Sequence, residues 1–286
     1  MLPRHRHFVA PMPDPQAAIA VQSVTLRVLT QMGELRACVV LQESTWGRDA
    51  ETVAASLLLV SSKFGGLVIG AYNERGTLLG FVFSLTGTDA QGALHWSHML
   101  AVSSDARGVG LGRLLKERQR AELASRGVNR IAWTFDPLQS RNAHLNINRL
   151  GARVVEYIDD MYGATGSPLH LFMATDRLVV MTGPELFAAP SRDVKSEEGL
   201  PVLTLSKWGV VGLDEPAATT ILVEVPWDIN EIASSDAILA ARWRDATRRH
   251  FHFGLANGFA VSGFVADWVA LRAYYCFTRA STREVR

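Results

Sequence analysis

The feature that most limits the fold of this chain is the run RGVGLG at residues 107–112, which carries glycine at every second position. An apolar segment, residues 94–102, precedes it, and a helical pattern, residues 113–126, follows it and ends at Gly127. In the order strand, glycine loop, helix, the loop amides and the first unpaired N–H groups of the helix converge, and the helix dipole adds partial positive charge. The run therefore predicts a phosphate-bearing ligand, against the alternative of a tight strand–helix turn without a ligand.

Three known glycine-loop patterns can be compared with this run. A P-loop needs a lysine followed by serine or threonine after its second glycine, and neither pair occurs here. A dinucleotide fingerprint, G-x-G-x-x-G, fails because its third glycine would fall on Arg113 or Leu115. The pattern R-x-x-G-x-G is satisfied by Arg107, Gly110 and Gly112, so it is the one that the residues support.

Composition restricts the class of protein further. The 286 residues suffice for one large or two modest domains, and a net charge of +1 predicts no general attraction to nucleic acid or to acidic membranes. Cys38 and Cys276 have no metal-ligand spacing, so we expect two core thiols in a reducing cytoplasm and no metal site. Residues 1–20 lack the apolar stretch of a signal peptide and are predicted to be a disordered tail.

Hydrophobic periodicity and turn residues divide residues 21–182 into alternating strands and helices. The predicted strands are 24–29, 66–72, 77–85, 94–102, 130–135, 153–158 and 170–181, and the predicted helices are 33–45, 50–64, 113–126 and 140–150, the last capped by Ser140. The run NERG at 73–76 predicts a hairpin turn.

The composition changes after residue 182. Residues 183–199 form a polar, proline-containing linker, and residues 200–286 predict a smaller α+β domain. The strands expected there are 202–205, 220–225, 259–265 and 268–278, with one helix over 235–255. Whether this domain covers an active site or forms a homodimer interface stays open.

Two of these features together resemble the GNAT superfamily of N-acetyltransferases: the R-x-x-G-x-G loop and the element order of residues 20–182. The strand HWSHML at 95–100 and the segment WTFDPLQSRNAHLNINRLGA at 133–152 resemble, more narrowly, one subgroup of predicted N-acyltransferases with an FDPLQSRNA-type motif. The resemblance implies an α/β (α+β) fold whose central mixed, mostly antiparallel sheet is flanked by helices, with the smaller C-terminal domain in addition. It also implies acetyl-CoA or another acyl-CoA as co-substrate.

The resemblance assigns donor-binding roles to several residues. The loop amides would hold the CoA pyrophosphate, through Arg107, Gly108, Val109, Gly110, Leu111 and Gly112. Arg113 and Lys116 would add positive charge near the phosphates, unless they are solvated helix surface. The backbone of Leu100, Ala101 and Val102 would line the pantetheine arm. Asn142 and Asn146, four residues apart on one helix, would bond the pantetheine peptide groups or serve as local polar surface.

The same resemblance assigns the proton acceptor. His98, on the strand that approaches the thioester, would relay the proton of the amine, since histidine titrates near neutrality; the alternative is a structural core histidine. His95 is expected on the opposite face of that strand. Glu43, near the end of the first helix, is a second-choice base or amine binder, or an ordinary solvated glutamate.

The proton donor is where the sequence departs from the family. Many members carry a tyrosine, four residues before the final glycine of the helix after strand five, that protonates the thiolate; here that residue is Ile147, which cannot donate. Tyr157 and Tyr162 are the remaining candidates, with Tyr162 taken as the catalytic one, or solvent supplies the proton.

Charged residues outside the loop have two interpretations each. Asp136, after the fifth strand, would cap the following turn or bind the ammonium group of an acceptor. The predicted helix at 235–255 carries Arg242, Arg244, Arg248 and Arg249, of which one could grip an acceptor carboxylate. A solvated face with salt bridges is the alternative for this set.

The function that follows is transfer of an acetyl or other short acyl group from acyl-CoA to the amine of a small molecule. Members of the subgroup are associated with N-acylamino-acid racemases, which points to succinyl-CoA and an amino-acid acceptor. An acyl-CoA sensor without turnover and a protein or peptide acetyltransferase are the alternatives. No nucleic-acid or membrane partner is expected.

Overall fold

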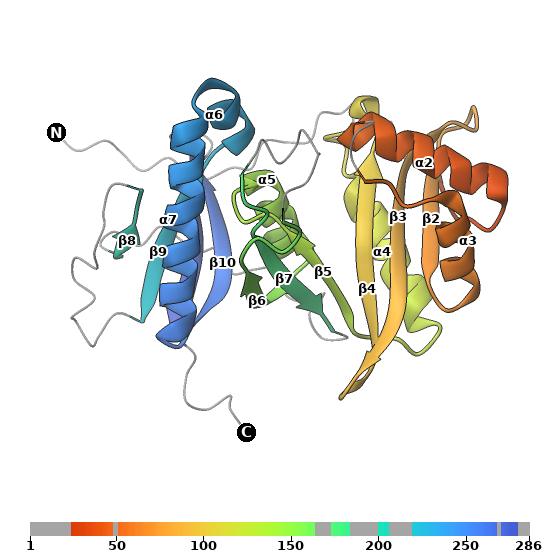
Figure 1. Cartoon of the computed structure of the whole chain (residues 1–286). Coiled ribbons are helices and arrows are strands. Elements are labelled where there is room, and N and C mark those ends of the chain that lie inside the picture. Colours follow the sequence, from red (N-terminus) through yellow and green to blue (C-terminus); the bar gives the residue numbers. More distant parts are fainter. Residues whose placement is uncertain are drawn as a thin grey trace.

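The structure is a computed structural model and describes residues 24–47, 51–163, 173–183, 200–205, 219–267 and 270–279. The predicted tail at 1–20 and residues 184–199 of the predicted linker lie outside the described residues. A seven-stranded and a four-stranded sheet lie side by side (Figure 1). The larger sheet belongs to the part of the chain that carries the glycine run.

The larger sheet has the strand order β1-β2-β3-β4-β5-β7-β6. The strands are β1 (Thr25–Val28), β2 (Leu67–Tyr72), β3 (Leu78–Asp89), β4 (Gly92–Val102), β5 (Ile131–Phe135), β6 (Arg153–Ile158) and β7 (Arg177–Thr182). All neighbouring strands are antiparallel except β4 and β5, which are parallel. The sheet is therefore mixed and mostly antiparallel, and the expected fold class and element order are confirmed.

Helices cover both faces of this sheet. They are α2 (Met32–Trp46), α3 (Ala55–Lys63), the short η1 (Ser104–Ala106), α4 (Leu111–Ala124), α5 (Ser140–Ala143) and the π-helical η2 (His144–Arg149). Phe81 and Phe83 of β3 share a buried cluster with Cys38 of α2, whereas the intervening Val82 shares another with Leu115 of α4. Since successive strand residues face opposite sides, α2 and α3 pack on one face and α4 on the other.

The predicted helix at 50–64 begins later than expected, at Ala55. The side chain of Gln42, buried on α2, bonds both main-chain groups of Val53: its Oε1 accepts from the Val53 N–H at 2.7 Å and its Nε2 donates to the Val53 carbonyl at 3.2 Å. These two bonds hold the chain extended just before α3, a constraint between distant residues that helical periodicity does not contain.

The smaller sheet has the order β10-β11-β9-β8. Its strands are β8 (Val202–Leu203), β9 (Thr220–Pro226), β10 (Phe259–Asp267) and β11 (Arg272–Arg279). The predicted helix over 235–255 is confirmed as α7 (Ala237–Ala256), and a short helix that the sequence did not indicate, α6 (Ile229–Ser235), precedes it. Asp228 caps α6, and Asp236 caps α7 by accepting from the Leu239 N–H at 2.8 Å. The aspartate between them therefore begins a new helix.

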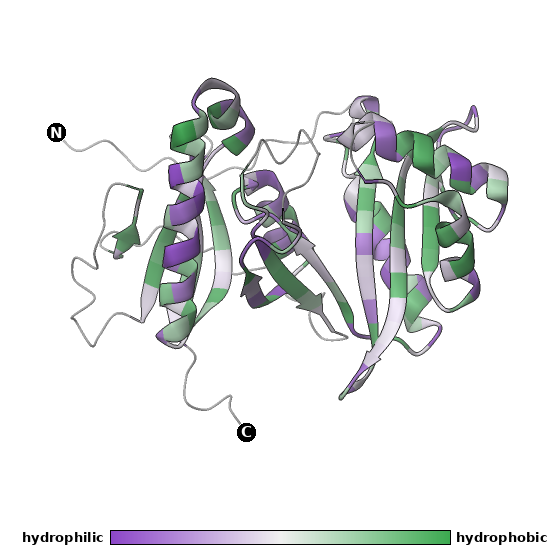
Figure 2. Cartoon of the chain, viewed as in Figure 1, coloured by the Kyte–Doolittle hydropathy of each residue, from purple (hydrophilic) through white to green (hydrophobic). Residues whose placement is uncertain are grey.

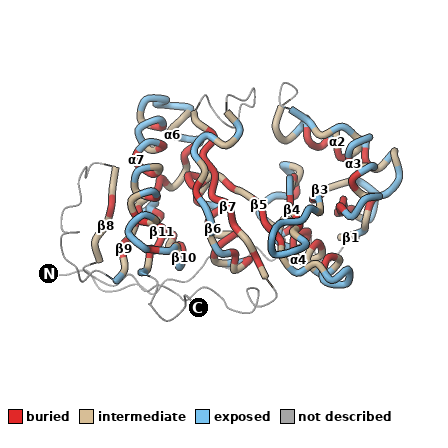
Figure 3. The backbone as a smooth tube through the Cα atoms, turned by 60° about the horizontal axis from the view of Figure 1, so that its bottom comes forward, coloured by how far each residue is buried: buried red, intermediate tan, exposed pale blue. Residues whose placement is uncertain are grey.

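The two units share one hydrophobic cluster. Strand β10 packs on η2 and on β6, and the rings of Tyr157 and Phe251 lie 5.1 Å apart across the boundary. Figure 3 shows the buried residues running through the strands on both sides of this boundary, and Figure 2 shows apolar residues in β7 and hydrophilic residues along α7. The smaller unit is therefore anchored to the half of the larger sheet that contains β5, β6 and β7.

Both cysteines are buried free thiols, as the sequence predicts. Burial raises the pKa of each to about 12, so neither is a reactive thiolate at neutral pH. Among the described helices, none combines the length and the apolar character that crossing a bilayer requires.

Candidate functional site

The two parallel strands β4 and β5 are paired for only two residues. Their ladder consists of His95 opposite Ile131 and Trp96 opposite Ala132. Beyond these pairs β4 continues to Val102 on β3, and β5 continues on β7, without further pairing to each other. The two strands diverge toward their carboxyl ends (Figure 1), which leaves unpaired main-chain groups facing one another.

The glycine loop lies directly after the diverging end of β4. Gly108 and Gly110 adopt φ values of 82° and 84°, in the left-handed region that favours glycine. Gly110 is the N-cap of α4, and a Cβ at either glycine would meet nothing within 4 Å. The Arg107 Nε donates to the carbonyl of Val102 at 3.1 Å, which ties the loop to the strand end.

This geometry suits an anion. The first turn of α4 points unpaired N–H groups at the loop, and the bare Cα atoms of the glycines leave room for a phosphate at the backbone. Arg113 is exposed and pairs with Glu117 at 2.7 Å. Lys116 is buried, so the interpretation of it as solvated helix surface is wrong.

His98 occupies a β-bulge in β4. Phe83 of β3 pairs with Met99 and the next residue, Ser84, pairs with Ser97, so His98 is the extra residue between them. The His98 ring contacts Phe83 edge-on at a centroid distance of 5.8 Å, on the side of α2 and α3. It is exposed, yet neighbouring protein removes enough of its hydration to lower its pKa, which leaves the ring neutral at physiological pH.

The bulge also fixes the other side chains of the strand. His95 lies on the opposite face from His98, as predicted, where its Nδ1 is 2.7 Å from the Thr86 hydroxyl. After the bulge, Leu100 and Val102 pack in the cluster of α4, while Ala101 packs in that of α2 and α3. The backbone of residues 100–102 lies along the divergence, where the resemblance expects the donor arm.

The remaining catalytic candidates lie near different ends of the sheet. Tyr162 is half exposed, and its hydroxyl is 3.3 Å from that of Thr134, two residues beyond the last paired residue of β5. The guanidinium of Arg177 lies over the Tyr162 ring at 5.2 Å. Glu43 is exposed on the last turn of α2. The structure thus brings Tyr162 to the diverging end of β5 and leaves Glu43 on the surface.

A buried polar group that the sequence did not single out lies at the closed end of the divergence. The Lys116 Nζ donates to the Ser97 hydroxyl at 2.7 Å and is 4.1 Å from the centroid of the Trp133 ring. Ser97 and Trp133 are the first residues of β4 and β5 beyond their last pair. Burial lowers the pKa of Lys116 to about 7. Helical spacing could have indicated the burial of Lys116, since it lies seven residues before Leu123 on the inward face of α4.

Asn142 and Asn146 differ in exposure. Asn142 is exposed, whereas Asn146 is buried and its Oδ1 accepts from the Trp133 indole at 2.8 Å. Ile147 is buried beside it. The helix widens to a π-helix from His144 onward, which alters the four-residue alignment on which the predicted shared face depended.

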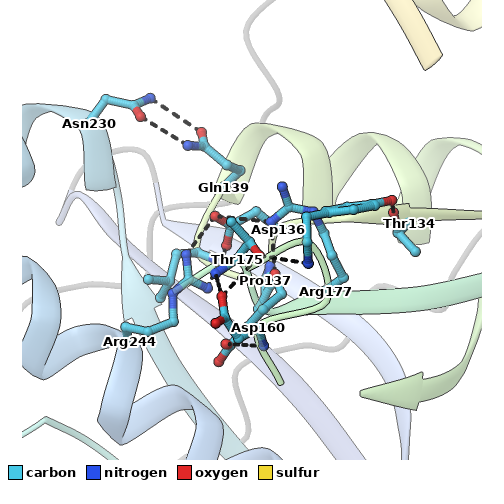
Figure 4. A network of polar contacts seen from close by, with 12 residues as sticks. Thr134, Asp136, Pro137, Gln139, Asp160, Thr175, Arg177, Asn230 and Arg244 are labelled. Atoms are coloured by element: carbon cyan, nitrogen blue, oxygen red, sulfur yellow. Dashed lines mark hydrogen bonds and ion pairs between the residues drawn. The ribbon is translucent and has the colours of Figure 1, made fainter. Parts of the chain in front are cut away.

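Ion pairs join the end of β5 to α7 (Figure 4). Arg244 donates to both oxygens of Asp136, at 2.8 and 2.6 Å, and Asp136 also accepts from the Leu138 N–H at 2.8 Å. The turn-capping role of Asp136 is therefore confirmed. The predicted cap by Ser140 is wrong, because its hydroxyl donates to the carbonyl of Pro226 in the smaller unit at 2.6 Å.

A second ion pair involves the buried Asp176. Arg248 donates to both of its oxygens, at 2.9 and 2.5 Å, and the Tyr157 hydroxyl donates at 2.6 Å. Burial raises the pKa of this carboxyl, but these bonds outweigh it and hold the pKa below its usual value. Arg244 and Arg248 thus take the salt-bridging alternative, and the hydroxyl of Tyr157 is already donated within the interface.

No family model and no curated protein matches the sequence. Several solved structures are similar in part. They include the alanine N-acetyltransferase of a ribosomal protein from Escherichia coli, at 18% identity over 59% of this chain and 97% of that one with a TM-score of 0.45. A polyamine N-acetyltransferase from Drosophila melanogaster matches at 13% identity, over 56% and 99%, with a TM-score of 0.45.

A mutant spermidine/spermine N-acetyltransferase from Vibrio cholerae matches at 14% identity, over 58% of this chain and 96% of that one, again with a TM-score of 0.45. Each alignment spans nearly the whole neighbour and little more than half of this chain. The features of this chain that indicate its function are therefore the strand divergence and the glycine loop.

Proposed function

We propose that this chain is an acyl-CoA-dependent N-acyltransferase that moves an acetyl or other short acyl group to the amine of a small molecule. The observation that carries the proposal is the loop of Gly108 and Gly110, placed between the diverging end of β4 and the N-terminus of α4. A dinucleotide or P-loop ligand would need residues that the loop lacks. A pyrophosphate followed by an extended arm fits both the loop and the divergence.

The chemistry asks the site for a proton acceptor and an oxyanion donor. His98, neutral at physiological pH beside the unpaired end of β4, is suited to accept the proton of the amine directly or through water. Main-chain N–H groups of residues 100–102 have no partner strand on the side of β5 and supply the donors that a developing oxyanion needs. Tyr162, near Thr134, is a candidate proton donor from the β5 side.

The acceptor is assigned by the resemblance of residues 133–152, which supports succinyl or acetyl transfer to an amino acid. Buried free thiols support a reducing compartment, the cytoplasm. A homodimer with the smaller unit as its interface is an assembly that size measurements by light scattering would test.

Replacing Gly110 with alanine is expected to weaken CoA binding about tenfold, because the added Cβ stands where the phosphate would lie against the backbone. Isothermal titration calorimetry with CoA measures the change. Gly127→Ala is the matched control, since Gly127 has a φ of 74° at the other end of the same helix region. It should lose stability and keep CoA affinity; equal affinities for the two variants would contradict the proposal.

Replacing His98 with alanine is expected to lower the rate of CoA release from acetyl-CoA or succinyl-CoA by about a hundredfold while CoA affinity is kept. A panel of amines and amino acids serves as acceptors, and free thiol is the readout. His252 is an exposed histidine of α7 that pairs with Asp159, and His252→Ala should leave the rate unchanged. If the wild-type protein binds CoA but none of the acceptors in the panel causes thiol release, the protein is better described as an acyl-CoA sensor.

A further inference from the structure

Lys116 is a buried amine without an acidic partner among the described residues. It lies on α4 with 8% of its surface exposed, and within the described chain its polar contact is the hydroxyl of Ser97. A lysine has three N–H donors, and one hydrogen bond and one aromatic face do not use them all. A cation in such a place costs folding free energy, so the fold gains nothing evident from it.

Other buried polar groups on the same side lack partners as well. The Nε2 of His95 and both amide atoms of Gln119 have no hydrogen bond within the described residues. Gln119 lies three residues after Lys116 on the inward face of α4, and the charge of Lys116 contributes to lowering the pKa of His95 to about 4, after burial and Arg126. Buried polar atoms are almost always satisfied in native proteins, so this side of the sheet is suited to a further polar occupant.

The position of Lys116 relates this polar group to the proposed donor site. Its Nζ bridges Ser97 of β4 and Trp133 of β5, the first residues past the last paired positions. An acyl donor held by its pyrophosphate at the glycine loop extends from the open end of the divergence toward this closed end. The sulfur is at the far end of the pantetheine arm, so it approaches the group that closes the divergence.

We propose that Lys116 is the binding site for the sulfur of the acyl donor and that its ammonium group protonates the departing thiolate. This assignment rests on the proposed function. It gives the role of proton donor, which Ile147 cannot fill, to Lys116 in place of Tyr162. Trp133 and Ser97 hold the amine of Lys116 at the closed end of the divergence, and Asn146 fixes the Trp133 indole by accepting from its Nε1.

Every bond and proton of the proposed acyl transfer is accounted for. The acceptor nitrogen forms a bond to the carbonyl carbon, the carbon–sulfur bond breaks, and its electron pair goes to sulfur. His98 takes one proton from the attacking amine, and Lys116 gives one to sulfur and becomes a neutral amine that accepts from the Ser97 hydroxyl. After thiol and amide leave, solvent returns a proton to Lys116 and removes one from His98. With a pKa of about 7, Lys116 can both give and regain its proton near neutral pH.

The test measures the thiol of bound CoA and needs no acceptor. Thiolate absorbance in the ultraviolet is followed from about pH 6 to about pH 9 for CoA bound to the protein, with bound desulfo-CoA as the blank. A thiolate beside Lys116 favours the protonated form of the lysine, so the two groups titrate as a coupled pair. The bound thiol should therefore ionise at a pH lower by about one unit or more than the thiol of free CoA. In Lys116→Met, which keeps the unbranched side chain up to the ε position and removes the amine, the thiol should titrate as it does in free CoA.

Gln119→Met is the matched control, because it removes a buried polar group one turn away on the same helix face; it should keep the lowered thiol pKa. A wild-type thiol that titrates like free CoA overturns the assignment even if Lys116→Met does not fold. Equal thiol titrations in the wild type and Lys116→Met overturn it as well. If neither CoA nor desulfo-CoA binds the wild type, the proposed function itself fails, and the assignment fails with it.

Discussion

Replacing Arg244 with alanine is expected to destabilise the protein by about 3–5 kcal/mol. The Arg244 side chain is 4% exposed and that of Asp136 is 15% exposed, and two hydrogen bonds join them across the boundary between the larger and smaller units. Removal of the guanidinium leaves the carboxylate desolvated. Arg177, at 3.9 Å, is too distant to replace both bonds. Urea unfolding followed by circular dichroism gives the change in free energy.

Two comparisons show whether that loss comes from the unpaired charge. Arg242→Ala, an exposed arginine on the same helix, should change stability by no more than about 0.5 kcal/mol. Arg244→Met combined with Asp136→Asn removes both charges and should recover a large part of the loss, since a buried pair often contributes little beyond mutual neutralisation. A loss for Arg244→Ala as small as that for Arg242→Ala would contradict this account of the interface.

Local chemistry explains which parts of the fold could be predicted from the sequence. The hairpin turn at 73–76 was predicted from its residues, and the structure has Asn73 accepting from the N–H groups of Arg75 and Thr77. The glycine loop was predicted for the same reason, because its pattern lies within six consecutive residues and its positive φ values favour glycine. The delayed start of α3 was not, since it depends on Gln42. The start of α7 was predicted, because its capping residue Asp236 is local to the helix.

The candidate site was predictable only where one element determines it. The bulge at His98 follows from the register between β3 and β4, which no single strand encodes. The pairing of Arg244 with Asp136 joins residues 108 positions apart. The burial of Lys116 was not predicted, because lysine is rarely buried without a partner. Its residue type favours the surface, whereas its position on the helix places it inside. Departures of this kind from local rules are where function is often found.

The unusual placement of Lys116 has a large expected effect on stability. Burial lowers its pKa from 10.5 to about 7, so between these two pH values the unfolded chain binds more protons than the folded protein. Stability contributed by this group therefore rises as the pH rises through that interval and is lost as the pH falls toward 7. Lys116→Met does not bear this cost, and we expect it to be more stable than the wild type by about 2–4 kcal/mol near pH 7.

The difference between Lys116→Met and the wild type should shrink as the pH rises toward 10.5, because the wild-type lysine is neutral in both states only above that pH. Urea unfolding at several pH values above 6.5 measures it, because His95, whose pKa is about 4, stays neutral there in the folded protein. Gln119→Met should give a difference from the wild type that does not change with pH, since glutamine does not titrate. If Lys116→Met is less stable than the wild type near pH 7, or its advantage is independent of pH, then Lys116 is not the desolvated amine that the site requires.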